Sequence, residues 1–368
     1  MLPIGNGNEA ALVSHSECRI ANNLLQVCAW LNQVDELPIA QTAVKHSPKP
    51  NMPDLSEVKG QEQAKRALII AAAGGHNLLF YGPPGTGKTM LASRLPGILP
   101  PLTSQQSLET AQVASISAQG FDTAAWGIPP FRNPHHTASA VALVGGGSNP
   151  LPGEISMAQN GVLFLDELPE FSRHVLEVLR EPLESGKIII SRAARSAEFP
   201  ARFQLITSLN PCPCGYFGDS SRECRCSLGQ IQHYRNKISG PLLDRIDLQV
   251  EVPRISHKQL RQNTNTSPNS EAIRQQVVAS REKQLKRNKG KTNALLNNKE
   301  MEQYINLSEK QLDYLELIVD QLKLSARAYH RIIKVSRTIA DLEGSDCVTQ
   351  AHLIEAISYR SFDRQQFN

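Results

Sequence analysis

Short apolar runs alternate with longer amphipathic segments through the middle of the chain. Four apolar runs bounded by polar or turn residues predict buried strands: 77–81, 162–165, 203–208 and 246–250. Before the first of them, segment 61–73 is rich in Ala, Leu and Ile and carries its charges on one side, which predicts a helix that ends at Gly74. Strands separated by helical segments are typical of a mostly parallel sheet, so the pattern predicts an α/β fold.

Two regions depart from this alternation. The extended runs 187–192 and 196–206, joined by a short polar turn, predict a hairpin just before a core strand. Segment 256–306 is polar, helical at best, and holds a basic cluster: Arg281, Lys283, Lys286, Arg287, Lys289 and Lys291. That cluster could contact DNA, although a solvated charged helix or a flexible linker is the simpler interpretation. Helical periodicity returns over 308–360 and predicts a small all-helical domain.

Length and composition set the class of protein. The 368 residues, of which 40% are hydrophobic and 20% charged, are enough for two or three globular domains. The longest apolar stretch, 67–73, is too short to cross a bilayer, and the N-terminus lacks a signal sequence, so we expect a cytoplasmic protein with no membrane partner. A net charge of +4 does not by itself indicate an acidic partner.

A glycine-rich loop carries the strongest chemical signal. The segment GPPGTGKT follows the strand 77–81 and precedes a helical run, which is the context that a phosphate-binding loop requires. Its residues are Gly82, Pro83, Pro84, Gly85, Thr86, Gly87, Lys88 and Thr89. The backbone N–H groups would surround the phosphates, Lys88 would neutralise the β- and γ-phosphates, and Thr89 would bind magnesium. A glycine turn that merely joins strand to helix is the alternative.

Two carboxylates end the predicted strand 162–165. Asp166 and Glu167 in GVLFLDEL would be costly at the end of a buried strand unless a cation or a water used them. Asp166 would hold the magnesium and its water shell, and Glu167 would be the general base that orients the attacking water. An exposed acidic turn is the alternative, but ends of parallel strands share one edge of a sheet, where the glycine-rich loop also lies.

Four of the seven cysteines lie within 15 residues. Cys212, Cys214, Cys224 and Cys226 form two C-x-C pairs separated by nine residues, a loop long enough to surround one tetrahedral zinc ion. Pro211, Pro213 and Gly215 favour a stiff turn of the knuckle type. The pattern predicts a structural zinc site, against the alternative of four reduced thiols in a flexible loop.

These motifs together resemble a known family, the AAA+ ATPases, and within it the magnesium-chelatase-like proteins of the ComM/YifB type. The resemblance extends over residues 54–360 and also rests on FRNPHHTAS, PGEISMAQNGVLFLDELPEF, NPCPCG, SGPLLDRID and LSARAYHRIIKVSRTIADLEG. It implies a fold class: an AAA+ P-loop parallel sheet with a hairpin before the first sensor and a zinc-knuckle insertion, followed by a small all-helical domain.

The resemblance also implies roles for three residues that their own chemistry leaves open. Asn210 matches the polar sensor of the γ-phosphate, although an Asn before Pro is equally typical of a turn. Arg245 matches the arginine finger that acts on a neighbouring subunit's ATP, although it could pair with Asp244 or Asp247. Arg327 matches the second sensor, although a solvated arginine is the simpler interpretation. A finger acting between chains implies a ring, which in this family is a hexamer.

Domain boundaries follow from the same comparison. Residues 1–45 are interpreted as a remnant of an N-terminal domain similar to the Lon protease fold, most of which is missing from the chain. The remaining parts are a proline-rich linker at 46–53, an AAA+ core similar to magnesium chelatase ChlI at 54–253, a basic polar linker or helical segment at 254–306, and a C-terminal helical lid domain at 307–368.

Three functions remain open at this point. The resemblance favours a motor that hydrolyses ATP, forms rings, and promotes branch migration on single-stranded or branched DNA, without sequence preference, in natural transformation or recombination. In such a ring the hairpin would place its basic residues in the pore: Lys187, Arg192, Arg195 and Arg202. Their charge alone is equally compatible with a solvated hairpin or with a pore loop that grips protein. The alternatives are a chelatase-type motor for metal insertion, against which the cysteine knuckle counts, and a protein-remodelling ATPase.

Overall fold

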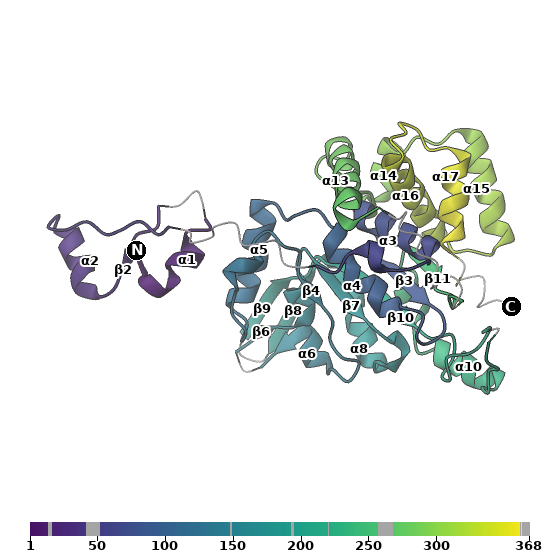
Figure 1. Ribbon diagram of the computed structural model, residues 1–368, viewed down its shortest axis with the longest axis horizontal. Coiled ribbons are helices and arrows are strands. Elements are labelled where there is room, and N and C mark those ends of the chain that lie inside the picture. The colour runs from purple at the N-terminus through teal and green to yellow at the C-terminus, as the bar shows by residue number, and fades with distance from the viewer. Residues whose placement is uncertain are drawn as a thin grey trace. The chain divides into compact units, whose positions relative to one another are not determined.

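The computed structural model describes residues 1–13, 17–41, 52–147, 149–192, 195–219, 221–256, 268–360 and 362 (Figure 1). The chain divides into two compact units. The first consists of residues 1–52 and 102–128, and the second of residues 53–101 and 129–368. The segment predicted as a continuous core at 54–253 therefore contributes residues to both units.

A five-stranded parallel sheet forms the centre of the second unit. Its strands are β3 (Leu78–Tyr81), β4 (Phe131–Arg132), β7 (Val162–Leu165), β10 (Gln204–Leu209) and β11 (Leu248–Glu251), in the order β11-β3-β10-β7-β4. All neighbouring pairs are parallel. The prediction of an α/β fold with a parallel sheet is confirmed, and the four predicted strands are displaced by two residues or fewer. The two-residue strand β4 has no periodicity to reveal it.

Apolar residues on both faces bury the three central strands of the sheet, β3, β10 and β7. In β3, Leu78 and Phe80 belong to one core, whereas Leu79 and Tyr81 belong to the other, as the alternation of side chains along a strand requires. Burial of alternate residues on both faces explains why these strands are continuous apolar runs.

Helices cover the first face of the sheet. They are α3 (Glu62–Gly74), α4 (Lys88–Ile98), α13 (Ser270–Arg287), α14 (Asn298–Tyr304), α15 (Glu309–Gln321), α16 (Ala326–Leu342) and α17 (Gln350–Ser358). The helices α13 and α16 pack against α3, and α17 packs against α16 (Figure 1). The predicted all-helical C-terminal region is confirmed. Among the described residues, no helix is long and apolar enough to cross a bilayer.

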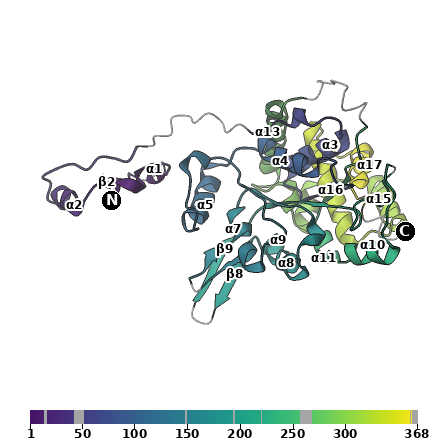
Figure 2. The same ribbon diagram turned by 60° about the horizontal axis from the view of Figure 1, so that its bottom comes forward.

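Shorter elements surround the second face. These are α6 (Ala140–Val144), β5 (Gly145–Gly146), β6 (Leu151–Pro152), α7 (Glu154–Met157), η4 (Leu168–Glu170), α8 (Arg173–Val178), α9 (Arg180–Ser185), α10 (Leu228–Arg235) and α11 (Gly240–Leu243). They frame the predicted hairpin, which forms from β8 (Lys187–Arg192) and β9 (Arg195–Pro200) and extends beyond its neighbours in Figure 2. The extended run predicted at 196–206 is divided between β9 and the start of β10, which residues 201–203 separate.

Some polar side chains of helix α13 bind to neighbouring helices instead of pointing into solvent. Arg281 donates hydrogen bonds to the carbonyl oxygens of Ala72 and Ala73, and Gln284 donates to that of Ala73, so both satisfy the C-terminal end of α3. Burial lowers the pKa of Arg281 to about 10. Arg287 pairs with Asp341 of α16 at 2.6 Å. Two members of the basic cluster therefore serve packing, which a sequence pattern cannot distinguish from a solvated charge.

An ion pair with a buried carboxylate joins the sheet to helix α16. Asp247, which precedes β11, pairs with Arg331 of α16 and accepts a hydrogen bond from the Asn77 backbone N–H at 2.9 Å. His76 lies 3.6 Å from Asp247 and contacts the Thr338 hydroxyl at 2.7 Å. Burial alone would raise the pKa of Asp247, but Arg331 and His76 outweigh it and hold the pKa well below its usual range.

The first unit contains short elements. Strands β1 (Leu2–Pro3) and β2 (Ile20–Ala21) pair in parallel, with α1 (Gly7–Ala10) between them. Helices α2 (Leu24–Leu31) and α5 (Ser104–Ser115) begin at the caps Asn23 and Thr103. Leu24 and Leu25 are 75% and 80% exposed, so α2 leaves apolar side chains uncovered within the described residues.

We expect the Asp247→Asn substitution to lower the free energy of unfolding by about 2–4 kcal/mol, because it removes the buried carboxylate that pairs with the partly buried Arg331. Glu198→Gln is the matched control, since Glu198 pairs with Lys187 where both side chains are about half exposed, and its removal should cost about 0–1 kcal/mol. Urea unfolding of the two variants measures both values. Equal losses would contradict a structural role for the pair of Asp247 and Arg331.

Candidate nucleotide site and cysteine cluster

The glycine-rich loop lies between β3 and α4 and surrounds the Lys88 ammonium group. Lys88 is 8% exposed, and its Nζ donates hydrogen bonds to the carbonyl oxygens of Gly82 at 2.7 Å and Pro83 at 2.8 Å. It also donates to Oδ1 of Asn210 at 3.1 Å. Lys88 therefore lies next to Asn210, the polar residue that follows β10. This agrees with the expectation that the ends of parallel strands meet at one edge of the sheet.

Gly82 is required where the loop leaves the sheet. A Cβ atom at this position would lie 2.4 Å from the carbonyl oxygen of Val252, which is far inside the contact distance. Its φ of +152° is also one that side chains rarely adopt. The close approach of two backbones at the end of β3 thus explains the first glycine of the motif.

The predicted acidic pair follows β7, beside the loop. Thr89 Oγ1 donates to Asp166 Oδ2 at 2.7 Å, and Ser208 Oγ donates to Asp166 Oδ1. The backbone N–H of Glu167 donates to Asp166 Oδ1 and to Ser208 Oγ at 3.1 and 3.2 Å. Thr89 and Asp166 offer adjacent oxygen atoms, the ligand type that magnesium prefers. Ser208 was not predicted, because a serine inside an apolar strand carries no distinctive motif.

Glu167 projects from a strained backbone. Its φ is +53°, in the left-handed region that is uncommon for residues other than glycine. The side chain is about half exposed, and its Oε2 lies 3.8 Å from Nδ1 of His136. His136 comes from the segment between β4 and α6. Its position beside Glu167 is a property of the fold.

Burial alters the charge balance at the loop. It lowers the pKa of Lys88 to about 8, although the nearby carboxylates Asp166 and Glu167 oppose this effect. A lysine of this kind is partly neutral just above physiological pH. A phosphate bound beside it would favour the charged form.

The two predicted arginines contact other parts of the chain. Arg245 is buried and pairs with Glu184 of α9, not with Asp244 or Asp247. The guanidinium of Arg327 is exposed and pairs with Asp244 at 3.1 Å. The structure therefore brings together Lys88, Thr89, Asp166, Glu167 and Asn210, and places the two arginines on the segment before β11 and on the start of α16.

A further contact to the loop was missed by sequence reasoning. Gln61, which precedes α3, donates to the carbonyl oxygen of Pro253 at 2.7 Å and to that of Thr86 at 3.4 Å. Gln61 therefore joins the start of α3 to the phosphate-binding loop and to Pro253, two residues after the end of β11. A lone glutamine before a helix gives no signal of this role.

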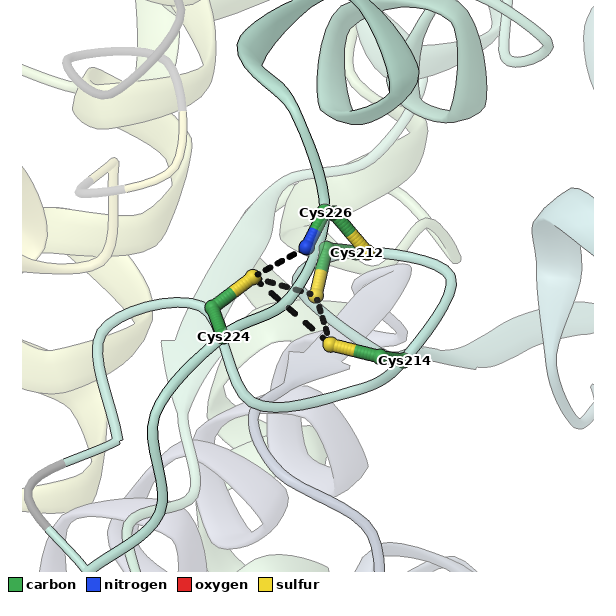
Figure 3. A group of neighbouring side chains, drawn as sticks. All are labelled: Cys212, Cys214, Cys224 and Cys226. Atoms are coloured by element: carbon green, nitrogen blue, oxygen red, sulfur yellow. Dashed lines mark hydrogen bonds between the residues drawn. The ribbon is translucent and has the colours of Figure 1, made fainter.

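The four cysteines meet at one point, as the spacing predicts (Figure 3). Their sulfur atoms all lie within 4.8 Å of one another, and Cys212 Sγ is 3.3 Å from Cys214 Sγ and 3.6 Å from Cys224 Sγ. Tetrahedral zinc with bonds of about 2.3 Å places its sulfur ligands about 3.8 Å apart. The distances also exceed the roughly 2.05 Å of a disulfide bond. The donor set and its spacing therefore fit zinc.

This architecture is that of an ATPase of the AAA+ class. Residues 54–260 match the family profile described as magnesium chelatase, subunit ChlI, and residues 267–360 match the profile of its C-terminal region. Because the two ranges account for most of the sequence, the chain belongs to the magnesium chelatase subunit ChlI family. Membership implies ATPase activity with ATP and magnesium.

Some relatives are similar over almost the whole chain, and others over part of it. The competence protein ComM of Haemophilus influenzae is 52% identical over 98% of this chain and 71% of its own length. The uncharacterized protein YifB of Escherichia coli is 47% identical over 98% of this chain and 70% of its own length. The magnesium-chelatase 38 kDa subunit of Cereibacter sphaeroides is 30% identical over 42% of this chain and 52% of its own length.

The pKa of Lys88 predicts how nucleotide binding depends on pH. Phosphate binds the charged lysine, so affinity should be full below about pH 8 and fall as pH rises through that value, by up to tenfold per pH unit. Titration with a fluorescent ADP analogue between about pH 7.5 and 9.5 measures this. Lys88→Arg is the control, because its charge persists over the range. A flat profile for the unaltered chain would contradict the buried-lysine account.

Proposed function

We propose that this chain is a ring-forming ATPase motor that moves along DNA and promotes branch migration in natural transformation or recombination. The observation that carries the proposal is its 52% identity, over 98% of the chain, to a protein named for competence. The convergence of loop, acidic pair and Asn210 at one edge of the sheet supports the ATPase part. A motor that moves along DNA in this way would work in the cytoplasm.

The proposed hydrolysis uses residues that lie at one edge of the sheet. Lys88 neutralises phosphate charge, and Thr89 with Asp166 holds magnesium, which neutralises the β- and γ-phosphates when bound. Glu167 orients the attacking water and accepts its proton, and Asn210 positions the γ-phosphate. The remaining loop residues, Gly82 to Gly87, present backbone N–H groups to the phosphates. The hydrogen bond from Lys88 to Asn210 supports placing both at one phosphate.

The proposed assembly explains the arginines that lie away from the loop. Arg245 would act on the nucleotide of the next subunit, so that each active site needs two chains and the working form is a ring, with six subunits as the expected number. Arg327 would act on the chain's own nucleotide. Its contact with Asp244, the neighbour of Arg245, supports a link between the two. If bound nucleotide attracts Arg327, the ion pair between Arg327 and Asp244 would break. The segment that carries Arg245 would then lose this contact with α16.

The hairpin is the proposed DNA contact. Buried Ile188, Ile190 and Phe199 attach it to the core, while Arg202 at its base is exposed. Lys187 pairs with Glu198 across the two strands. A firmly attached hairpin that carries four basic residues suits contact with the phosphates of DNA without reading sequence. Structural zinc in the cysteine cluster completes the proposal.

The test is the ATP hydrolysis rate of the purified chain with and without single-stranded and forked DNA. DNA should raise the rate several-fold, and Glu167→Gln should lower it by about 100-fold or more while nucleotide still binds. Hydrolysis that ignores DNA but responds to a tetrapyrrole and a catalytic partner would favour a metal-insertion motor. A response to an unfolded protein alone would favour a remodelling ATPase.

The proposed contact between the hairpin and DNA is tested with a separate pair of variants. Replacing Arg192 and Arg195 together with Ala should abolish stimulation by DNA and reduce the salt dependence of binding, while hydrolysis without DNA is retained. Replacing Lys283 and Lys286, two exposed residues of α13, removes the same charge elsewhere and should change neither quantity. Equal effects of the two pairs would count against the hairpin as the contact.

A further inference from the structure

The cysteine loop, residues 212–226, touches the phosphate-binding loop directly. It begins two residues after Asn210, and Gly215 lies against Pro84. A Cβ atom at Gly215 would be 2.7 Å from Pro84 Cδ and 3.1 Å from Pro84 Cγ. The cysteine cluster is therefore joined to the nucleotide site at two places, one along the chain and one through this contact.

The other end of the cysteine loop is also fixed. Helix α10 begins directly after Cys226, with Ser227 as its cap. From that helix, Arg235 donates to the carbonyl oxygen of Pro211 at 3.3 Å, and its guanidinium lies 5.4 Å from the ring centre of Phe217. The cysteines thus connect the end of β10 with the start of α10 (Figure 3).

The cysteine loop has almost no apolar core of its own, and its other contacts are polar or aromatic ones such as the ion pair between Arg254 and Asp219. Among its described residues only Cys212 and Gly215 are buried. The backbone N–H of Gly215 donates to the carbonyl oxygen of Cys212 at 2.9 Å, so the buried glycine is held in a turn that starts at a metal-ligand position. A loop with so small an apolar core depends on its cross-link, and metal binding supplies one.

We propose that the cysteine loop is a metal-dependent support for the nucleotide site. Zinc bound by the four thiolates fixes Gly215 against Pro84, and this tightens nucleotide binding at the phosphate-binding loop. The inference rests on the zinc and nucleotide sites of the proposed function. It adds that the zinc acts on nucleotide affinity, beyond stabilising a surface loop.

Equilibrium binding of a fluorescent ADP analogue to the full chain tests the proposal. Zinc content is measured by atomic absorption before and after chelation and after zinc is returned. Removing zinc should raise the Kd at least about tenfold, and returning it should restore the original value. An unchanged Kd, or a purified chain that takes up no zinc, would overturn the inference.

The proposed function can be judged separately in the same experiment. A zinc-loaded chain that binds no nucleotide contradicts the proposed ATPase itself, and the inference fails with it. A chain that binds and hydrolyses ATP equally well with and without zinc contradicts only the inference. Far-ultraviolet circular dichroism of the zinc-free chain distinguishes a local effect, which leaves the spectrum unchanged, from general unfolding, which would also overturn the inference.

Two glycines of the cysteine loop form a matched pair that leaves every cysteine in place. Gly215 and Gly218 have nearly equal φ values of +85° and +80°, but a Cβ at Gly218 meets nothing within 4 Å. Gly215→Ala should raise the Kd about tenfold with one zinc per chain retained. Gly218→Ala carries similar backbone strain and should leave the Kd near its original value. Equal Kd values for the two variants would overturn the proposed contact.

A double variant identifies the partner atom. Pro84→Ala removes the Cγ and Cδ atoms that a side chain at Gly215 would meet. In that background, Gly215→Ala should change the Kd by much less than it does in the unaltered chain, because the effects of contacting residues are not additive. Fully additive effects would show that Gly215 acts through something other than Pro84.

Discussion

The site depends on one constraint, which is that parallel strands end at the same edge of a sheet. Neighbouring strands β3, β10 and β7 bring the phosphate-binding loop, Asn210 and the acidic pair to that edge. The hydrogen bonds from Lys88 to Asn210 and from Thr89 to Asp166 are the result. Segments that are 77 and more residues apart in sequence therefore meet without any long-range signal in the sequence.

Polar contacts tie the surrounding elements to this edge. The Asp247 to Arg331 pair joins β11 to α16, and Asp244, three residues before it, holds Arg327 at the start of the same helix. The helical region is thus attached to the segment that carries Arg245. The cysteine loop, in turn, contacts Pro84 of the phosphate-binding loop. The nucleotide site is therefore in direct contact with the cysteine loop, whereas the ion pairs connect the helical region to the segment before β11.

Local patterns explain which features could be predicted. Apolar runs predicted the four long strands, and GPPGTGKT and the C-x-C pairs predicted groups of residues that the structure does bring together. The patterns could not reveal contacts made by isolated residues. Ser208, Gln61 and His136 reach the site only because distant elements pack together. Arg281 and Arg287 likewise belong to a basic cluster in sequence but satisfy buried partners in the fold.

The central claim is that nucleotide hydrolysis at this sheet edge drives movement on DNA. Its most direct test is branch migration of a synthetic four-way DNA junction by the full chain, comparing ATP with a non-hydrolysable analogue at equal occupancy of the site. The account predicts that ATP converts the junction into its products and that the analogue does not. Equal conversion with both nucleotides, or none with ATP by a chain that hydrolyses it, would contradict the claim.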